Sequence, residues 1–336
     1  MKRVLVVGAG GFLGSHLLEK GVSVPDLEIY AGIRETTSVK WFPETGVTSV
    51  HFDFEDRENV EKVLTSTLPE GEKWDWIVYN LGATKCLRYK DFDHINHDIL
   101  RTFVEALEKT GMMPEKFIYI SSLSAIGPGD SRSYTPFNEK MIPQPNTRYG
   151  ASKLKAEMLL QMHSVPYIIF RCTGIYGPRD HDYFLMMDAM RKGFDFSVGF
   201  RKQLLTFIYA PDLATAVFEA LDKSPVKEIY NIAEPRAYSQ KEFRSIVAGK
   251  LRKKLVVPVK VPLWGTRVVS WICEKIGVVR GKPSTLNSDK YNIMKQRNWS
   301  VDTSKAYLTF GFKAATPLSK GIDESIDWYR KEGWMK

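Results

Sequence analysis

The sequence contains little cysteine: its 336 residues include only Cys86, Cys172 and Cys273, and no two of them form a CxxC pair. An odd number of widely separated thiols argues against a disulfide framework and against a zinc site, so we expect no bound metal and a reducing, cytoplasmic environment. No apolar run is long enough to span a bilayer. The first residues, MKRVLVVGAG, lead directly into a predicted strand and do not resemble a signal peptide.

Acidic residues are in deficit. The chain has 48 Lys and Arg against 39 Asp and Glu, which gives a net charge of +9. Apart from the short run Lys250, Arg252, Lys253 and Lys254, the cations are scattered, so the pattern does not predict nucleic-acid binding. A solvated basic surface is the simplest interpretation, and attraction of an anionic cofactor, substrate or lipid is the alternative.

Apolar β-branched runs alternate with helical patterns through the first half of the chain. Strands are predicted at Arg3–Val7, Glu28–Ile33, Ser49–Phe52, Trp76–Asn80, Phe117–Ser121 and Tyr167–Arg171, and helices at Phe12–Lys20, Glu58–Thr65, Asn96–Lys109 and Tyr149–His163. Continuous Val/Ile runs are typical of strands buried on both faces. The sequence therefore predicts an α/β fold with a Rossmann-type, doubly wound parallel sheet.

After Arg171 glycine, proline and aromatic residues become common, and the alternation weakens. A helix at Pro211–Leu221 and a strand at Glu228–Ile232 still fit the first domain. We therefore predict a Rossmann domain made of residues 1–172 and 207–232, with residues 173–206 and 233–336 forming a smaller, mostly helical substrate-binding cap.

A glycine turn follows the first strand and leads into the first helix. It comprises Gly8, Gly10, Gly11, Phe12, Leu13 and Gly14. Such glycines permit a tight turn, a close approach to pyrophosphate and close packing of helix on strand, while the helix N–H groups face the phosphates. This context predicts a dinucleotide site.

The end of the second strand favours NADP(H) over NAD(H). NAD-binding folds usually place an acid there for the ribose hydroxyls, but this chain has Ile33 followed by Arg34. A guanidinium suits a 2′-phosphate. NAD(H) remains the alternative, because Glu35 could serve a ribose. Asp53 with Phe54 follows the third strand, where the Asp either meets an adenine or caps a loop.

Tyr149 and Lys153 lie four residues apart at the start of a helix, so both project from one face. A nearby ammonium favours the phenolate, and we expect Lys153 to lower the pKa of Tyr149 so that it can exchange a proton with a carbinol or carbonyl. Ser122 and Ser124 follow the fifth strand, and strand alternation would place both on one face, where one could hold the substrate oxygen.

Together these motifs resemble the extended short-chain dehydrogenase/reductase, or NAD-dependent epimerase/dehydratase, family. The resemblance implies that Ser122, Tyr149 and Lys153 are catalytic, and that Asn96, which opens a helix, supports a proton relay. It extends to residues expected around the cofactor: Leu81, Gly82, Ala83, Cys172, Gly174 and Ile175. Lys85, Ser124 and Tyr176 are the expected substrate contacts. Cys172 replaces the family's usual proline, and Pro211 interrupts its usual Val-Asp.

The dehydratases of the family carry an Asp-Glu pair after the catalytic hydroxyl residue, whereas this chain has Leu123-Ser124. The segment Ala31–Arg34 resembles the dihydroflavonol reductase and 3β-hydroxysteroid dehydrogenase branch, which implies oxidoreduction of a hydrophobic, sterol-, sphingolipid- or flavonoid-like alcohol or ketone. The alternatives are a nucleotide-sugar epimerase that holds NAD tightly, and a non-catalytic NADP-sensing regulator, which would not need Tyr149 and Lys153.

Large apolar residues recur at helical spacing in residues 256–277, just after the basic run. The segment is interpreted either as a cap helix packed on the core, which is favoured, or as a surface for peripheral membrane contact over residues 250–277. The family resemblance further implies a homodimer formed through helices Asn96–Lys109 and Tyr149–His163.

Overall fold

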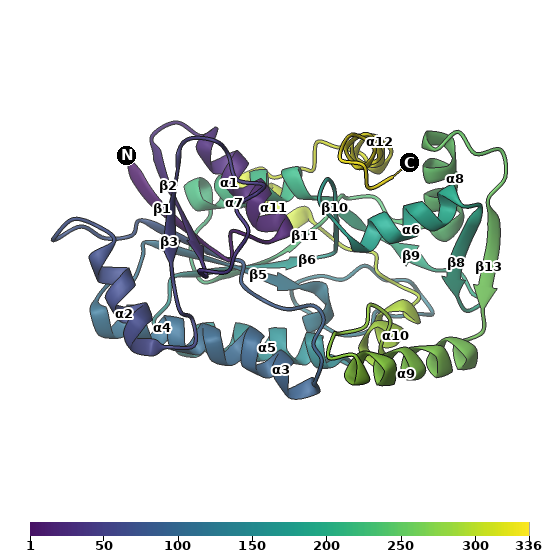
Figure 1. The fold of residues 1–336 in the computed structure, drawn as a ribbon, viewed down its shortest axis with the longest axis horizontal. Coiled ribbons are helices and arrows are strands. Elements are labelled where there is room, and N and C mark those ends of the chain that lie inside the picture. Colours follow the sequence, from purple (N-terminus) through teal and green to yellow (C-terminus); the bar gives the residue numbers. More distant parts are fainter. Residues whose placement is uncertain (336) are drawn as a thin grey trace.

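The computed structural model describes residues 1–335, with a seven-stranded parallel sheet at its centre (Figure 1). Across the sheet the strands are β11 (Glu228–Ile232), β6 (Tyr167–Cys172), β5 (Lys116–Ser122), β4 (Trp76–Tyr79), β1 (Lys2–Val7), β2 (Leu27–Ile33) and β3 (Val47–His51). The strand order reverses between β1 and β4, so a crevice opens beyond their carboxyl ends. The predicted doubly wound α/β fold is confirmed.

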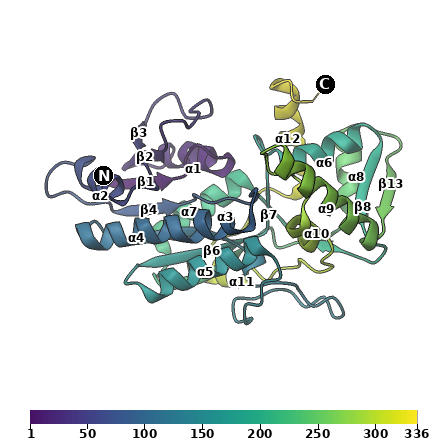
Figure 2. The same ribbon diagram turned by 60° about the horizontal axis from the view of Figure 1, so that its bottom comes forward.

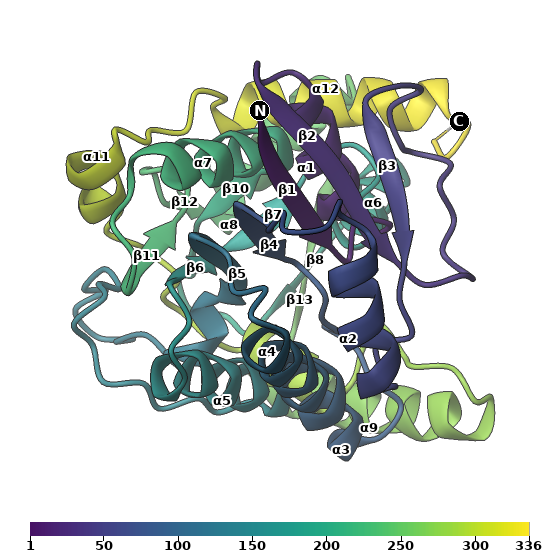
Figure 3. The same cartoon turned by 90° about the vertical axis from the view of Figure 1, so that its left-hand side faces the viewer.

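Helices cover both faces of the sheet (Figure 3). One layer contains α1 (Phe12–Val22), α7 (Ala210–Lys223) and α11 (Ser304–Phe310), and the other contains α2 (Arg57–Ser66), α3 (Tyr89–Asp93), α4 (Ile99–Thr110) and α5 (Arg148–Met162). Each layer buries its own cluster of Val, Leu, Ile and Phe against one face, as continuous apolar strands require. The position of α11 differs from the prediction: Phe310 packs on the large sheet, although its segment was expected in the cap.

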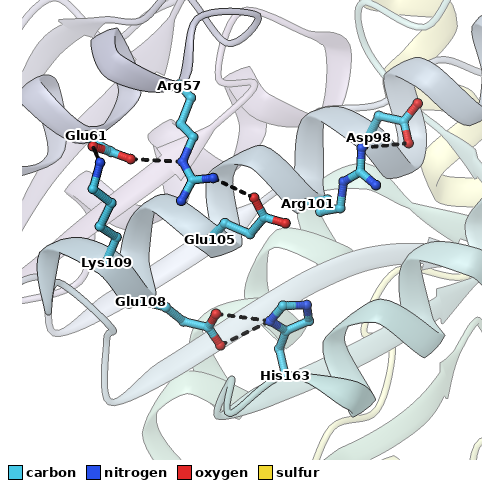
Figure 4. Close-up of polar contacts among 8 residues, drawn as sticks. All are labelled: Arg57, Glu61, Asp98, Arg101, Glu105, Glu108, Lys109 and His163. Atoms are coloured by element: carbon cyan, nitrogen blue, oxygen red, sulfur yellow. Dashed lines mark hydrogen bonds and ion pairs between the residues drawn. The ribbon is translucent and has the colours of Figure 1, made fainter.

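Ion pairs connect the outer sides of α2, α4 and α5 (Figure 4). Arg57 on α2 contacts Glu61 on the same helix and Glu105 on α4, with N–O distances of 2.9 and 3.0 Å. His163, at the end of α5, lies 3.1 Å from Glu108 of α4. The charges on this face are therefore largely neutralised within the chain.

A smaller lobe lies beyond the carboxyl ends of the strands. Its helices are α6 (Asp182–Arg191), α8 (Gln240–Lys250), α9 (Leu263–Val279), α10 (Ser288–Met294) and α12 (Leu318–Lys331), and its short strands pair as β7 (Gly174–Tyr176) with β10 (Phe207–Tyr209), β8 (Phe194–Val198) with β13 (Val257–Val261), and β9 (Leu204–Leu205) with β12 (Tyr238–Ser239). A separate aromatic-rich core holds α6, α8 and α12 together. Among residues 1–335, no helix combines the length and apolarity needed to cross a membrane.

Two local features near the sheet edge differ from the predictions. Asn96 does not open an α-helix, because residues His94–Asp98 form a π-helical turn between α3 and α4. Ser124 does not continue the alternation of β5, because the strand ends at Ser122 and a short 3₁₀ turn covers Leu123–Ala125. The Ser124 N–H instead donates to the Ser122 hydroxyl at 3.2 Å.

Candidate active site

The glycine turn between β1 and α1 forms a cradle that side chains would fill. Gly8 has a φ of +78°, and a Cβ on it would lie 2.7 Å from the backbone nitrogen of Leu81. A Cβ on Gly14 would press against the carbonyl oxygens of Gly8 and Ala9, whereas one on Gly11 would meet nothing closer than 3.5 Å. No side chain caps the N-terminus of α1. Its first N–H groups therefore fit an anionic group such as a pyrophosphate.

The turn after β2 closes against this cradle. The backbone N–H of Thr37 donates to the Arg34 carbonyl at 2.9 Å, and the Arg34 N–H donates to the Thr37 hydroxyl at 3.1 Å. A Cβ on Gly10 would strike the Thr37 methyl group. The Arg34 side chain is exposed and forms no ion pair within residues 1–335, whereas Glu35 lies 3.3 Å from His51. The cation is thus free to bind a ligand beside the cradle.

Asp53 and Phe54 occupy the turn between β3 and α2. The carboxylate of Asp53 accepts the Glu55 N–H at 3.1 Å, which is the loop-cap alternative of the sequence interpretation. Phe54 is buried and stacks on Phe52 with ring centroids 5.1 Å apart. Its backbone is therefore the part of Phe54 that could contact a cofactor.

The start of α5 positions Tyr149. Thr147 caps the helix by accepting the Gly150 N–H at 2.9 Å, and the carboxylate of Asp289 accepts the N–H of Tyr149 at 2.8 Å. Gly150 is required because a Cβ would collide with the carbonyl oxygen of Ser124. The 3₁₀ turn after Ser122 and the α5 N-terminus are thereby in direct contact, which brings Ser122 to Tyr149.

Burial, more than any nearby charge, sets the proton affinity of Tyr149. It raises the pKa of the phenol to about 12, although a hydrogen bond with Ser122 acts in the opposite direction. The prediction that Lys153 lowers this pKa is therefore wrong for the cofactor-free chain. Burial also lowers the pKa of Lys153 to about 8, because its ammonium is desolvated.

Lys153 and Asn96 meet beneath Gly82. The Lys153 Nζ donates to the carbonyl oxygen of Ile120 at 2.8 Å and lies over the Tyr119 ring. A Cβ on Gly82 would lie 3.1 Å from that Nζ and 2.9 Å from the Asn96 Oδ1. Asn96 also accepts the Ala83 N–H at 2.8 Å. The residues predicted after β4 thus adjoin the predicted catalytic lysine.

A second hydrogen bond of Asn96 reaches α5. Its Nδ2 donates to the Ser152 hydroxyl at 2.9 Å. This bond holds the π-helical turn against the helix that carries Tyr149 and Lys153. Asn96 can therefore keep these two elements in register, and its predicted part in a proton relay stays a prediction.

Sequence reasoning missed a buried ion pair one turn beyond Lys153. Glu157 of α5 is fully buried and accepts from the Arg171 guanidinium of β6 at 2.7 Å. The Ser121 hydroxyl of β5 donates to the same carboxylate. The periodicity Tyr149, Lys153, Glu157 would have revealed this shared face.

The predicted substrate contacts separate into two groups. Lys85 pairs with Asp182 of α6, which also binds Lys290 at 3.3 Å. Tyr176, by contrast, is 1% exposed in the core of the smaller lobe, and its hydroxyl lies where a Cβ on Gly321 would be. The expectation that Tyr176 contacts substrate is therefore wrong.

The chain passes directly from β6 into the short strand β7. Cys172 is buried at the end of β6, and burial raises the pKa of its thiol to about 12. The Tyr183 hydroxyl lies against the backbone of Gly174, where a Cβ on residue 174 would collide with it. Ile175 packs on the core beneath. Residues 172–175 are thus held against the core at the end of β6.

Comparison with known proteins agrees with this geometry. The model of the NAD-dependent epimerase/dehydratase family matches residues 4–233, from β1 through the end of β11. The chain belongs to this family. Its members are NAD-dependent enzymes, and the glycine cradle with the uncapped α1 N-terminus fits the dinucleotide that they bind.

Curated relatives within the family differ in substrate. The chain is 25% identical to dTDP-D-glucose 4,6-dehydratase of Mus musculus, over 98% of this chain and 89% of the relative. It is 22% identical to sterol-4-alpha-carboxylate 3-dehydrogenase, decarboxylating, of Dictyostelium discoideum (96% and 100% covered) and 23% identical to ceramide reductase of Caulobacter vibrioides (99% and 96% covered).

A solved structure supports the fold. The dTDP-glucose 4,6-dehydratase of Bacillus anthracis, in complex with NAD, superposes with a TM-score of 0.77 at 20% identity, covering 100% of this chain and 99% of that one. The extended fold of the family therefore spans both lobes described here.

We predict that Glu157→Ala lowers the free energy of unfolding by roughly 3–5 kcal/mol, because the Arg171 guanidinium would remain buried without its partner. Urea unfolding measures the loss. Lys155→Ala, which removes an exposed ion pair with Asp93 from the same helix, is the control and should cost at most about 1 kcal/mol. Equal losses for the two variants would contradict the assigned importance of the buried pair.

The lowered pKa of Lys153 predicts a pH dependence of stability. Between about pH 8 and 10.5 the unfolded chain holds a proton on this lysine that the folded chain has released, so the contribution of Lys153 to stability increases with pH across this window. Cys172 and Tyr149, whose pKa values burial raises, contribute in the opposite direction. The Lys153 contribution is about 3 kcal/mol. Urea unfolding of the cofactor-free wild type and of Lys153→Met across this window measures it. The stability of the wild type relative to Lys153→Met should rise with pH across the window, and parallel curves would refute the assignment.

Proposed function

We propose that this enzyme transfers hydride between NADP(H) and a secondary alcohol or ketone on a hydrophobic substrate. The observation that carries the proposal is the convergence of Tyr149, Ser122 and Lys153 at the crevice beside the glycine turn. These groups supply proton transfer and oxygen binding, and the family supplies the nicotinamide chemistry.

A bound nicotinamide would donate or accept the hydride at its C4. With a pKa of about 12, the Tyr149 phenol is protonated at neutral pH and can give its proton to the oxygen of a ketone as that carbon is reduced. Ser122 donates a hydrogen bond to the same oxygen. Lys153 holds its ammonium near the crevice, where it can bind ribose hydroxyls.

The chain lacks the acidic pair that elimination of water requires. Leu123, which follows Ser122, is 1% exposed in a core cluster, and Ser124 has no carboxylate. No acidic pair therefore stands where the dehydratases of the family have one for elimination. This argues for oxidoreduction, despite the 25% identity with a dehydratase.

A cavity that adjoins Phe92 and Asp289, which contact the ring and the backbone N–H of Tyr149, supports a hydrophobic substrate. It has a volume of about 240 Å³ and lies between α3, α9 and the segment that carries Asp289. Its lining combines apolar side chains, including Leu87, Phe92 and Val278, with the polar side chains of Arg88, Glu274, Asn287 and Asp289. The sterol and ceramide enzymes among the relatives act, by name, on molecules of this chemistry. An NAD-dependent nucleotide-sugar epimerase is the second candidate, favoured by the nucleotide-sugar relatives.

Two further proposals concern the enzyme's surroundings. Free thiols at Cys86, Cys172 and Cys273 favour a cytoplasmic location. A homodimer through α4 and α5 stays a prediction, supported by the exposed Met158 and Met162 on α5.

Tyr149→Phe should lower turnover by about 10²–10⁴-fold, because the proton donor is lost, while cofactor binding persists. The wild type is first screened with NADPH and NADH over ketosteroids, 3-ketosphingoids and nucleotide sugars. Fluorescence titration of NADPH verifies that the variant still binds cofactor. Unchanged turnover in the variant would exclude this mechanism, and epimerisation without net redox change would favour the sugar epimerase.

Arg34→Ala should reduce kcat/KM for NADPH by roughly ten- to a hundredfold, because charged hydrogen bonds to the 2′-phosphate are lost, and should leave kcat/KM for NADH nearly unchanged. Glu35→Ala, one residue away, is the control and should change neither value. A preference for NADH in the wild type that survives Arg34→Ala would overturn the cofactor assignment.

A further inference from the structure

Helix α9 turns its large apolar side chains away from the protein. Trp264 is 74% exposed and Trp271 57% exposed. The other exposed apolar residues of the helix are Leu263, Val268, Val269, Ile272, Ile276, Val278 and Val279. The side packed on the protein carries Thr266, Ser270 and Gly277, which are small and buried. The favoured interpretation of residues 256–277, a helix with its apolar face on the core, is therefore wrong.

The inner side of α9 is fixed by polar contacts. Glu274 accepts the Tyr89 hydroxyl of α3 at 2.6 Å and the Ser288 N–H of α10 at 3.0 Å. A Cβ on Gly277 would lie 2.9 Å from the Lys282 carbonyl oxygen. These contacts orient the helix, so its outer apolar face is a stable feature of the surface. Figure 2 shows α9 on the outside of the smaller lobe, with α10 beside it.

More apolar side chains are exposed where the strand pair β8–β13 leads into α9. Phe194, Phe196 and Phe200 are 48%, 54% and 65% exposed, respectively. Leu263, the first residue of α9, lies 3.6 Å from where a Cβ on Gly199 would be, next to Phe200. We call the exposed apolar residues of α9, together with these three phenylalanines, the α9 face.

The α9 face is surrounded by cations that have no ion-pair partners. Residues 252–282 contain eight exposed Lys and Arg and a single acid, Glu274, whose carboxylate is already hydrogen bonded. The eight are Arg252, Lys253, Lys254, Lys260, Arg267, Lys275, Arg280 and Lys282. Within residues 1–335 no salt bridge involves any of them, in contrast to the paired charges of α2, α4 and α5 (Figure 4).

We propose that the α9 face docks this enzyme onto the surface of an anionic phospholipid bilayer. A helix with exposed tryptophans and aliphatic side chains, flanked by unpaired cations, can lie in the plane of the lipid–water interface. Its apolar side chains enter the acyl boundary, and its Lys and Arg bind lipid phosphates. Because α9 also lines the cavity near Tyr149 through Val278, docking holds that cavity close to the lipid.

Charge complementarity selects lipid over a second copy of the chain. Two α9 faces brought together would oppose two sets of unpaired cations, which repel each other. Anionic headgroups supply the opposite charge. Because lipids move within a fluid bilayer, the headgroups can gather opposite these cations without a fixed complementary shape. The docking proposal does not depend on the substrate, so its failure would leave the proposed reaction standing.

Flotation of the full-length enzyme with vesicles tests the proposal. One set of vesicles contains phosphatidylglycerol as a third of its lipid, and the other is pure phosphatidylcholine. The wild type should bind the anionic vesicles more tightly. The double variant Trp264→Ser, Trp271→Ser should lower the partition coefficient by at least about tenfold. Its matched control is Tyr307→Ser, Leu308→Ser on α11, with 57% and 79% exposure, which should bind as the wild type does.

A charge variant tests the second half of the proposal. Replacing Arg267, Lys275 and Arg280 with Gln should weaken binding to anionic vesicles by roughly fivefold per charge. Replacing three cations of α4 and α5, namely Arg101, Lys109 and Lys155, should have a much smaller effect.

Three outcomes would overturn the proposal. In the first, the wild type floats with neither kind of vesicle. In the second, the double tryptophan variant binds anionic vesicles as tightly as the wild type does. In the third, the wild type forms oligomers without lipid, and the tryptophan substitutions dissociate them. The last result would make the α9 face an interface between copies. Circular dichroism and retained turnover on a water-soluble ketone verify that the variants fold.

Discussion

The buried ion pair between Glu157 and Arg171 ties the active-site helix to the sheet. Glu157 lies two turns after Tyr149 and one turn after Lys153, so fixing its carboxylate against β6 and the Ser121 hydroxyl of β5 sets the rotation of α5. Lys153 adds a third attachment, to the Ile120 carbonyl oxygen. The position of the phenol is therefore set both by the capping contacts at the start of α5 and by the buried pair two turns further along the helix.

Two desolvated charges on one helix have different consequences. Three donors surround the Glu157 carboxylate, whereas Lys153 has one carbonyl partner and a pKa of about 8. The Lys153 amine therefore holds its proton more weakly than an exposed lysine does. Polar groups of a bound ligand would compensate its burial, so ligand binding and the protonation of Lys153 are thermodynamically linked.

The sequence predicted those features that depend on spacing along one element. The glycine turn, the Tyr149/Lys153 pair and the sheet strands all follow local periodicity, and the structure contains them. Predictions that depended on an element's end were wrong: Ser124 left the strand because a 3₁₀ turn begins at Leu123, and Asn96 lies in a π-helical turn. Proton affinities could not be predicted either, because burial is a property of the whole fold. The outward orientation of the apolar face of α9 could not be predicted, because the hydrophobic periodicity is the same whether that face meets the core or the solvent.

The sheet is completed late in the sequence, and this has a consequence for biosynthesis. Strand β6 has no neighbour on its outer side until β11 arrives, and the apolar face beneath α7 is finished by Phe310 and Phe312. On the ribosome, the nucleotide-binding half therefore keeps an open strand edge and bare apolar surface until nearly the whole chain has emerged. Such a nascent chain would require shielding from aggregation until these late segments have folded onto the sheet.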